Sequence, residues 1–369
     1  MKKEMKKILL FGLVFSINLL LSCSEMKEKK YKFDARPSVP DGYPAEAVFG
    51  GMVGEAHIDH GSYLESGWGR SGSIVVIGDG MHPLPDSIRV RFFSYIDNKF
   101  YHKESYPLPQ ERIKELLEMS YKDNTIGEYR YTTFQVSLAP GGWVTVWLSG
   151  GLGQIELLSF QADEAPDWSY EKAFPGRKSS REKFVEIRRS DMYSFVQQEI
   201  AENRIPYDYW KRLSKKYQWK LTTNDPGFEV YRYGSDFINI ERRRSWTEPN
   251  WLTELNEKAI PKDLFFLLRH DKDPVRYKVH LYLVEPRDQN NKDQEGQTYR
   301  EMTRTRCLMD LFDKFYAEAG DEEVSLMVEF NDSMTAAQVK LKTAAKEQVI
   351  DGCRVRGIWD SDSSRSGDW

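Results

Sequence analysis

The chain has 369 residues, a formal net charge of −4, and 53 basic against 57 acidic side chains. This mild acidic balance leaves no basic excess for nucleic acid, so we expect no nucleic-acid partner. Ten Trp, twenty Tyr and nineteen Phe residues favour a β-rich exported protein over a helical one.

Residues 1–22 have the pattern of a signal peptide. Four lysines precede the apolar run Ile8–Leu21, which is too short to span a bilayer stably. The run ends in Leu20-Leu21-Ser22-Cys23, which resembles the lipobox of bacterial lipoproteins. In that family the signal is removed before the cysteine, so Cys23 would carry the acyl chains and anchor the protein. The alternative is an ordinary secreted protein with an incidental cysteine.

Cleavage before Cys23 would remove four Lys and one Glu and move the formal charge from −4 to −7. Residues 23–32 would then form a lipidated tether, which is charged and lacks apolar periodicity. Because Ser24 rather than Asp follows the cysteine, we expect the anchor in the outer membrane, facing the periplasm.

Residues 33–163 are predicted to form an N-terminal β-rich domain. Ser87–Phe92 alternates polar and apolar side chains, and Phe100–Tyr106 follows a turn as its partner strand. A second hairpin joins Tyr129–Leu138 to Trp143–Leu148 through a proline-glycine turn. These two hairpins are expected to organise the domain.

Other parts of this domain carry weaker patterns. Pro109 is expected to open a helix with Ile113, Leu116 and Leu117 on its buried face. Tyr31–Asp86 looks irregular and strand-poor, apart from a short buried strand at residues 73–77. A further strand is expected at residues 155–160.

Residues 164–182, rich in Pro, Gly and Ser, are expected to be a linker, and residues 183–360 to hold helices followed by a C-terminal β-rich region. One helix is expected to start at Ser190-Asp191. Another should start at Pro206 and place Trp210, Leu213 and Tyr217 on one side.

The C-terminal region is expected to begin with a hairpin that turns at Gly234-Ser235. Val275–Leu283 has the clearest alternation in the chain, Gln297–Ala319 has helical spacing, and Val324–Phe330 alternates again. Residues 361–369 form a polar tail. The sequence therefore predicts an α+β fold, mainly antiparallel β-sheet with several helices packed against it.

Two cysteines remain beyond Cys23. Cys307 and Cys353 could form one disulfide, worth about 4 kcal/mol in the chain-entropy model, or stay two separate buried thiols. Both alternatives fit the composition, and a bridge requires the two residues to be close in space.

Catalytic and metal-binding patterns are weak. The segment Ile77–Gly80 resembles an esterase nucleophile block, but glycine stands where serine is needed, so we expect a turn. His57 and His60 could offer two metal ligands, yet a surface loop is expected. His280 is expected to be a satisfied surface histidine. We therefore expect no enzyme, no metal and no cofactor.

Several short motifs, each occurring once, follow one another in a characteristic order within residues 43–239. They are Pro85-x2-Ile88-x3-Phe92-x-Ser94, Tyr101, Leu108-Pro109-x3-Ile113, Pro140-Gly141-Gly142, Val146-Trp147-Leu148-x-Gly150 and Ile205-Pro206-x3-Trp210. In this order they resemble a family of uncharacterised bacterial lipoproteins, a domain of unknown function. Members are often encoded beside phospholipase effectors of the type VI secretion system, which implies periplasmic immunity proteins. The family offers no catalytic residues, and the longer C-terminal half of this chain departs from it.

Two sets of side chains could bind a partner. The first comprises Trp68, Arg70, Arg242, Arg243, Arg244 and Trp246, since arginine and tryptophan are common anchors of interfaces. Alternatively, the three successive arginines Arg242–Arg244 are only the solvated end of a strand and bind no partner. The second set, Trp68, Trp143 and Trp147, could stack on sugars or close a core.

Three functions compete on these grounds. The first is an anchored interaction protein, held to the membrane through Cys23, that neutralises a secreted phospholipase effector. The second is a module that binds an envelope glycan or another ligand. The third, less favoured, is a hydrolase with an unrecognised site.

Overall fold

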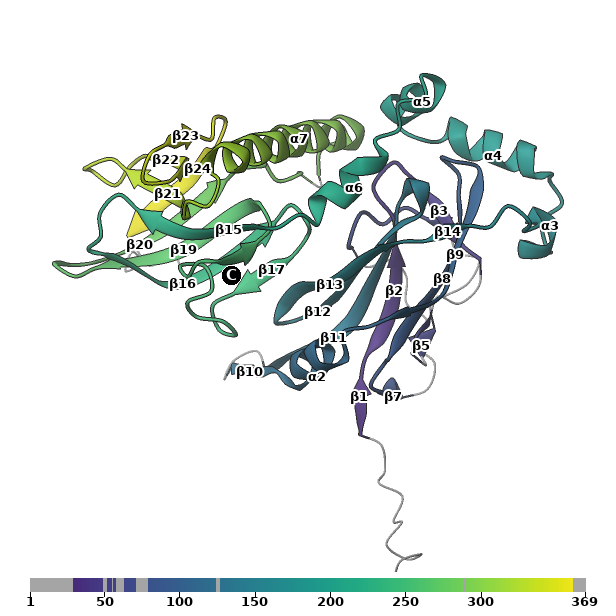
Figure 1. The fold of residues 1–369 in the computed structure, drawn as a ribbon, viewed down its shortest axis with the longest axis horizontal. Helices are drawn as coiled ribbons and strands as arrows, with labels where there is room; N and C mark the ends of the chain where they lie inside the picture. The colour runs from purple at the N-terminus through teal and green to yellow at the C-terminus, as the bar shows by residue number, and fades with distance from the viewer. Residues whose placement is uncertain are drawn as a thin grey trace, which may run out of the picture.

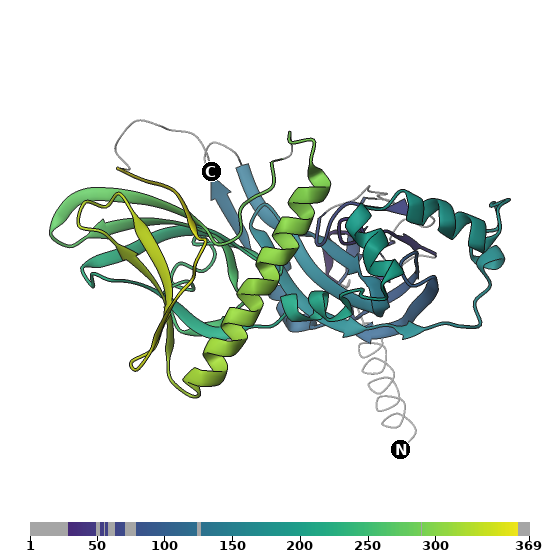
Figure 2. The ribbon, with the colours of Figure 1, turned by 90° about the horizontal axis from the view of Figure 1, so that it is seen from above.

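The computed structural model describes residues 29–48, 52–54, 56–57, 63–70, 79–123, 127–288 and 290–360. They form two halves that lie side by side, an N-terminal half of residues 29–213 and a C-terminal half of residues 217–360 (Figures 1 and 2). Among the strand pairings of the described residues, two are parallel and the rest antiparallel. The β-rich α+β class is therefore confirmed, although helices are few.

The N-terminal half packs a seven-stranded sheet against part of a larger sheet. The smaller sheet consists of β14 (Asp163–Glu164), β9 (Lys99–Pro107), β8 (Ser87–Ser94), β3 (Ala45–Ala47), β6 (Tyr63–Leu64), β4 (Met52–Val53) and β5 (Ala56–His57). The β8–β9 hairpin forms as predicted. Between the sheets, Ile88, Val90 and Phe92 of β8 share a buried core with Phe134 and Val136.

The larger sheet has ten strands and runs through both halves. In order they are β10 (Ser120–Asp123), β11 (Gly127–Leu138), β12 (Trp143–Gly150), β13 (Gly153–Gln161), β17 (Arg242–Arg244), β16 (Phe228–Phe237), β19 (Pro261–His270), β20 (Asp273–Tyr282) and β24 (Arg354–Asp360), and β2 (Asp34–Ser38) pairs with β11. The second predicted hairpin is β11–β12. The halves join where β13 meets β17, through the single residue pair Gln154 and Arg242.

The C-terminal half adds a five-stranded sheet and the longest of the described helices. The sheet is β18 (Asn256–Lys258), β15 (Tyr217–Thr223), β21 (Val324–Phe330), β22 (Ala337–Lys342) and β23 (Glu347–Val349). Helix α7 (Gln294–Ala319) starts at Asp293, whose carboxylate accepts from the Gly296 amide at 2.8 Å. In Figure 2, α7 crosses the molecule between the two halves. Leu308 and Phe312 of α7 pack in the core of this half.

Strand β12 faces a different core on each side. Val144, Val146 and Leu148 belong to the core between the two sheets of the N-terminal half. Trp147, on the other side, belongs to the core that continues into the C-terminal half. The strand is therefore buried on both faces.

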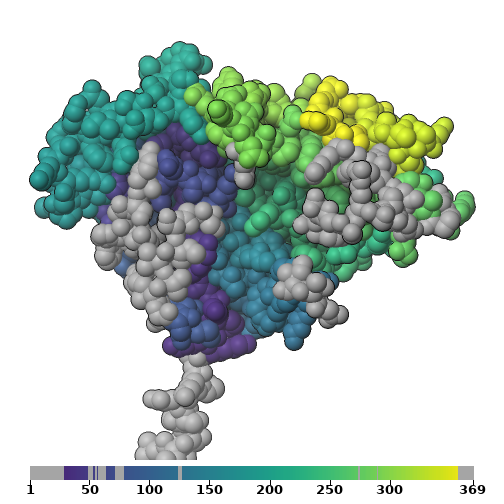
Figure 3. All heavy atoms as spheres, turned by 180° about the vertical axis from the view of Figure 1, so that it is seen from behind, coloured from purple at the N-terminus to yellow at the C-terminus, as the bar shows by residue number. Residues whose placement is uncertain are grey.

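The remaining helices of the described residues lie in the N-terminal half. They are α2 (Gln110–Glu118), the 3₁₀ turn η1 (Pro140–Gly142), α3 (Tyr170–Ala173), α4 (Arg181–Ser190), α5 (Ser194–Ala201) and α6 (Tyr207–Leu213). Helix α2 follows Pro109 and buries Ile113, Leu116 and Leu117, as predicted. In the view from behind, the teal helices α3–α5 project beside the sheets, and β1 (Lys30–Lys32) lies at the lower end with its partner β7 (Met81–Pro83) (Figure 3).

Segment 164–182, the expected linker, carries α3. It attaches helices α3–α5, which we call the helical arm, to the sheet. Arg177 forms an ion pair with the buried Glu46 and lies between two aromatic rings, 4.2 Å from Phe174 and 4.1 Å from Phe184. Arg189 donates to the Tyr95 carbonyl at 2.9 Å. These arginines hold the arm against the β8–β9 hairpin.

Four sequence predictions differ from the structure. The helix predicted to start at Ser190-Asp191 is α5, which starts later, at Ser194, because a preceding helix, α4, continues to Ser190. Helix α4 begins after Ser180, whose hydroxyl accepts from the Lys183 amide at 3.3 Å. Tyr217 belongs to β15 rather than to the preceding helix. The region 31–86 is not strand-poor, because seven short strands lie within or across it. The strand predicted at residues 73–77 and the tail 361–369 lie outside the described residues.

The fourth difference concerns the turn predicted at Gly234-Ser235. Both residues continue β16, where they pair with Phe265 and Leu264 of β19. The chain turns later, where the Phe237 amide donates to the Glu241 carbonyl at 2.9 Å. Long-range ladder pairing has overridden the local turn signal.

Candidate functional site

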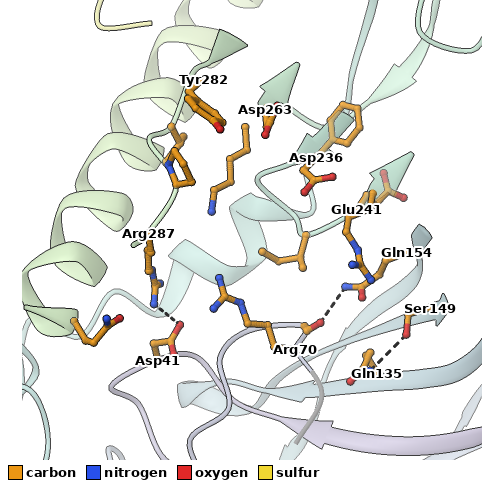
Figure 4. Close-up of a pocket in the computed structure, with 18 of the residues that line it drawn as sticks. Asp41, Arg70, Gln135, Ser149, Gln154, Asp236, Glu241, Asp263, Tyr282 and Arg287 are labelled. Carbon is orange, nitrogen blue, oxygen red and sulfur yellow. Dashed lines mark hydrogen bonds and ion pairs between the residues drawn. The ribbon is translucent and has the colours of Figure 1, made fainter. Parts of the chain in front are cut away.

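A polar cavity of about 540 Å³ opens at the junction of the two halves, and we call it the junction cleft (Figure 4). Its floor comes from β11, β12 and β13 of the N-terminal half, and its far wall from β16, β17, β19 and the end of β20. The strands that form the floor and the far wall are distant in the sequence, but they belong to the same ten-stranded sheet, which fixes their positions.

The floor of the cleft is lined by buried polar side chains. Gln135, Ser149 and Gln154 are at most 5% exposed. The Ser149 hydroxyl donates to the Thr133 carbonyl at 3.2 Å, and the Gln154 amide donates to the Gly69 carbonyl at 3.1 Å. These hydrogen bonds fix the direction of the Ser149 and Gln154 side chains.

Arg70 enters the cleft from a short loop. Gly67 and Gly69 have φ angles of 94° and 63°, which favour glycine. The Gly69 amide donates to the Ser137 hydroxyl at 2.8 Å, and a Cβ on Gly69 would approach Ile240 to 3.0 Å. The loop is thereby pinned to the sheet. In Figure 4, the Arg70 guanidinium points into the cavity.

Arg242 reaches the cleft from β17 of the other half, and its backbone pairs with Gln154. The side chain is exposed, but it lies on a concave surface where protein replaces much of its water. This desolvation lowers the pKa of the Arg242 guanidinium, while the carboxylate of Asp236 opposes the shift. Within the described part of the chain, neither Arg70 nor Arg242 has an ion pair or a guanidinium hydrogen bond.

The other charged side chains of the cleft are paired. Arg287 contacts Asp41 at 2.8 Å and also pairs with Glu301, which binds Lys262 as well. Burial opposes ionisation of Glu301, but the two cations prevail and lower its pKa. On the far wall, Asp236 pairs with Arg244 at 3.1 Å, and Asp263 contacts His280 at 2.9 Å.

A buried ionic network lies beside the cleft. Glu241 is fully buried and binds Arg243 at 3.1 Å and Lys216 at 3.5 Å, and it accepts from the Glu156 amide at 3.0 Å. Burial and the neighbouring Glu241 raise the pKa of Glu156. Arg243 also pairs with Glu248 at 2.8 Å. The network joins β13 to β17, so its role is to hold the two halves together at the junction.

Ile240 marks local strain at the same place. It lines the cleft and has a φ of 67°, which a β-branched residue rarely adopts. The surrounding turn holds this conformation, because the Ile240 amide donates to the Phe237 carbonyl at 3.0 Å. Strain of this kind is most common at binding and catalytic sites.

The structure brings two of the six predicted partner-binding residues into this cleft, Arg70 and Arg242. Arg243 is buried with Glu241, and Arg244 is paired with Asp236. Trp246 stacks on Tyr121 at 5.0 Å and on Tyr129 at 5.5 Å.

The tryptophan platform proposed for sugars does not form. Trp68 and Trp147 are buried and meet edge to face at 5.4 Å, and the Trp147 indole donates to the Asn239 carbonyl at 2.9 Å. Trp143 is partly buried, with the Lys211 ammonium 5.9 Å from its ring. These rings close a core.

The disulfide alternative is wrong for this structure. Cys307 is an exposed free thiol on α7, and Cys353 is a free thiol at intermediate exposure. Burial raises the pKa of the Cys353 thiol to about 11, so it stays protonated at neutral pH.

Other predicted features are partly outside the described residues. Cys23, residues 58–60 and residues 71–78 lie there. Asp79 accepts from the Met81 amide at 2.9 Å, as expected of a turn. His280 is satisfied by Asp263. In the described ranges no group of three metal-binding side chains occurs, and no helix is long and apolar enough to cross a membrane.

Sequence reasoning missed the floor of the cleft and the Asp41–Arg287 pair. One signal was available: β11 alternates Thr133, Gln135 and Ser137 with apolar residues, and this polar face is buried. A buried polar face on a central strand points to a bound group or a polar junction. The Asp41–Arg287 pair had no such signal, since it joins residues 246 positions apart.

Residues 22–208, just over half of the chain, match the model of a protein family of unknown function, DUF2931. The chain therefore belongs to this family. No curated protein and no solved structure matches it significantly. The matched segment includes Arg70 and the floor of the cleft, whereas Arg242 and the far wall lie beyond it.

Proposed function

We propose that this protein is a lipid-anchored binding protein of the bacterial cell envelope, which binds a partner through the junction cleft. The anchor is supported by the lipobox-like Leu20-Leu21-Ser22-Cys23. The partner is a phospholipase-type toxin, in line with the immunity role implied for relatives of this kind, and the protein neutralises it by occlusion.

One observation carries the binding role. Arg70 and Arg242 come from opposite halves to one cleft, and within the described residues neither forms an ion pair, although the cleft's other basic residues do. Desolvation of the Arg242 guanidinium is unfavourable, and binding of an acidic group would compensate this cost. Arginine is also enriched among residues that dominate interface energy.

The tether strengthens this proposal. A phospholipase acts at the bilayer surface, and an acylated Cys23 would hold the inhibitor in the same layer. Tethering raises the effective concentration of the inhibitor, so a modest interface gains occupancy. Rigid walls built on strands and short loops suit this role, because little ordering is required on binding.

Co-expression in the periplasm with a phospholipase-type effector tests the function. Cells with the wild-type protein should survive and yield a complex. Arg70→Glu with Arg242→Glu should abolish survival at unchanged protein level. The matched control is Arg269→Glu, the same charge change at an exposed residue paired with Glu229, and it should protect fully. Equal killing with and without the wild-type protein, with no complex recovered, would contradict the immunity function.

The anchor has a separate test. Cys23→Ser should move the protein from the membrane fraction to the soluble fraction, because no acyl chain is then attached. Retention of this variant in the membrane fraction would show that another element anchors the protein.

A second function is favoured by a different feature of the cleft. Its floor presents Gln135, Ser149 and Gln154, and amides and hydroxyls of this kind also bind glycans. If the effector is not neutralised, binding to purified envelope glycans becomes the next measurement. Loss of glycan binding in Gln154→Leu would then assign the cleft to that ligand.

A further inference from the structure

We infer that the junction cleft is an anion-binding site in which Arg70 and Arg242 together hold one carboxylate or phosphate group of the ligand. This rests on the part of the proposed function that places the ligand in the cleft. It adds the chemical class of the ligand and the two residues that recognise it.

The charges of the cleft support an anion. Its four carboxylates each have a partner in the structure: Asp41 with Arg287, Asp236 with Arg244, Glu241 with Arg243, and Asp263 with His280. Lys262 and Arg287 both pair with Glu301, and Arg287 also pairs with Asp41. Among the described residues that line the cleft, Arg70 and Arg242 are the basic side chains without an ion pair.

Gln154 positions both arginines. Its side-chain amide donates a hydrogen bond to the carbonyl of Gly69 at 3.1 Å, and Gly69 directly precedes Arg70 in the chain. Its backbone pairs with Arg242 across the β13–β17 junction. Each arginine therefore lies one contact away from the same buried residue, which is 3% exposed. Gln154 is therefore a positioning residue: it orients the two arginines, and its uncharged side chain adds no charge to the site.

The chemistry of the two guanidinium groups fits an oxyanion. Each offers several N–H donors in a planar fork that matches carboxylate and phosphate oxygens. An anion between them would accept charge-assisted hydrogen bonds from both halves of the protein. Since β13 and β17 share only one residue pair, such a ligand would also strengthen the junction.

Titration calorimetry on the detergent-purified full-length protein tests the inference at constant ionic strength. Two probes distinguish the source of the anion: a glutamate-containing peptide supplies a carboxylate, and glycerol 3-phosphate supplies a lipid-like phosphate. At least one should bind the wild-type protein. Arg70→Ala and Arg242→Ala should each weaken its binding at least tenfold, and Arg269→Ala should leave it unchanged.

Gln154→Leu sharpens the test of positioning. It should weaken anion binding severalfold while the unfolding transition stays cooperative, because both arginines remain but lose their alignment. Gln154→Glu should weaken binding further, since its charge competes with the anion for Arg70 and Arg242.

The outcomes separate this inference from the proposed function. If neither probe binds the wild-type protein, or if the Arg70→Ala/Arg242→Ala double variant binds as well as the wild type, the anion site is wrong. Protection of co-expressing cells would then still support the proposed function. Anion binding lost in the arginine variants, without any protection of cells, supports the anion site and overturns the toxin partner.

Discussion

The interior of the N-terminal half and the junction between the halves are built by the same strands, but their chemistry is opposite. On one face of the large sheet, Phe134, Val136 and Val146 pack in a wholly apolar core. On the other face, Gln135 and Gln154 turn polar groups toward the cleft. The comparison teaches that burial alone does not define a role. The apolar face stabilises the fold, while the polar face leaves charged groups able to bind.

The apolar face should give the largest effect on stability. Phe134 is fully buried between the two sheets, so Phe134→Ala leaves a cavity. We expect the free energy of unfolding to fall by about 3–5 kcal/mol, measured by urea unfolding. Leu255→Ala, at a residue 39% exposed, is the control and should change it by less than about 0.5 kcal/mol. Similar losses in both variants would contradict the assignment of the core.

The ionic network tests whether charges at the junction are structural. Arg243→Met leaves Glu241 buried with Lys216 as its remaining cation, and should cost about 3 kcal/mol of unfolding free energy. Glu241→Gln in the same background removes the buried negative charge and should restore at least half of the loss. A double variant as unstable as the single one would show that the ion pair is not what matters.

Lys258 provides a buried charge away from the junction. Its ammonium is fully buried, donates to the Trp219 and Glu254 carbonyls at 2.6 Å, and has its pKa lowered to about 7 by desolvation. Above pH 7 the folded protein releases this proton, while the unfolded chain keeps it until about pH 10.4. Stability therefore rises with pH across that window.

The measurement compares the wild-type protein with Lys258→Met between pH 7 and pH 9. The difference in unfolding free energy should shift by about 2 kcal/mol in favour of the wild type as pH rises. Because other titrating groups are common to both proteins, they cancel in the difference. A difference independent of pH would show that Lys258 titrates normally.

The smallest effect on stability should come from the two cleft arginines. Neither makes an ion pair in the described residues, so Arg70→Ala and Arg242→Ala should each change the free energy of unfolding by less than about 0.5 kcal/mol. The same variants should lose partner binding. A large loss of stability in either would place that arginine in the scaffold, together with Arg243.

Local patterns predicted much of the fold. Alternation identified β8, β20 and β21, and a proline-glycine turn identified the β11–β12 hairpin. Pro109 with helical spacing identified α2. The turn at Gly234 failed because pairing with β19 is a long-range interaction. The sequence also treated Arg242–Arg244 as one patch. Along a strand, however, successive side chains alternate between faces, so Arg243 is separated from Arg242 and Arg244.

The candidate site was only partly predictable for the same reason. Arg70 and Arg242 were chosen by residue type, but their convergence depends on Gln154, whose side chain contacts Gly69 across 85 positions of the sequence. Carboxylate partners decide which arginines remain available, and those partners are set by tertiary packing. Composition and spacing carry no information on that pairing.

Hydrogen exchange of the protein with and without its bound partner tests the central claim most directly. If the junction cleft is the binding site, protection should rise in residues 67–70 and 237–243, which carry Arg70 and Arg242 on the two sides of the cleft. The Arg70→Glu/Arg242→Glu variant should show no change at the same partner concentration. Protection confined to another surface, such as the helical arm α3–α5, with the cleft unchanged, would contradict the claim.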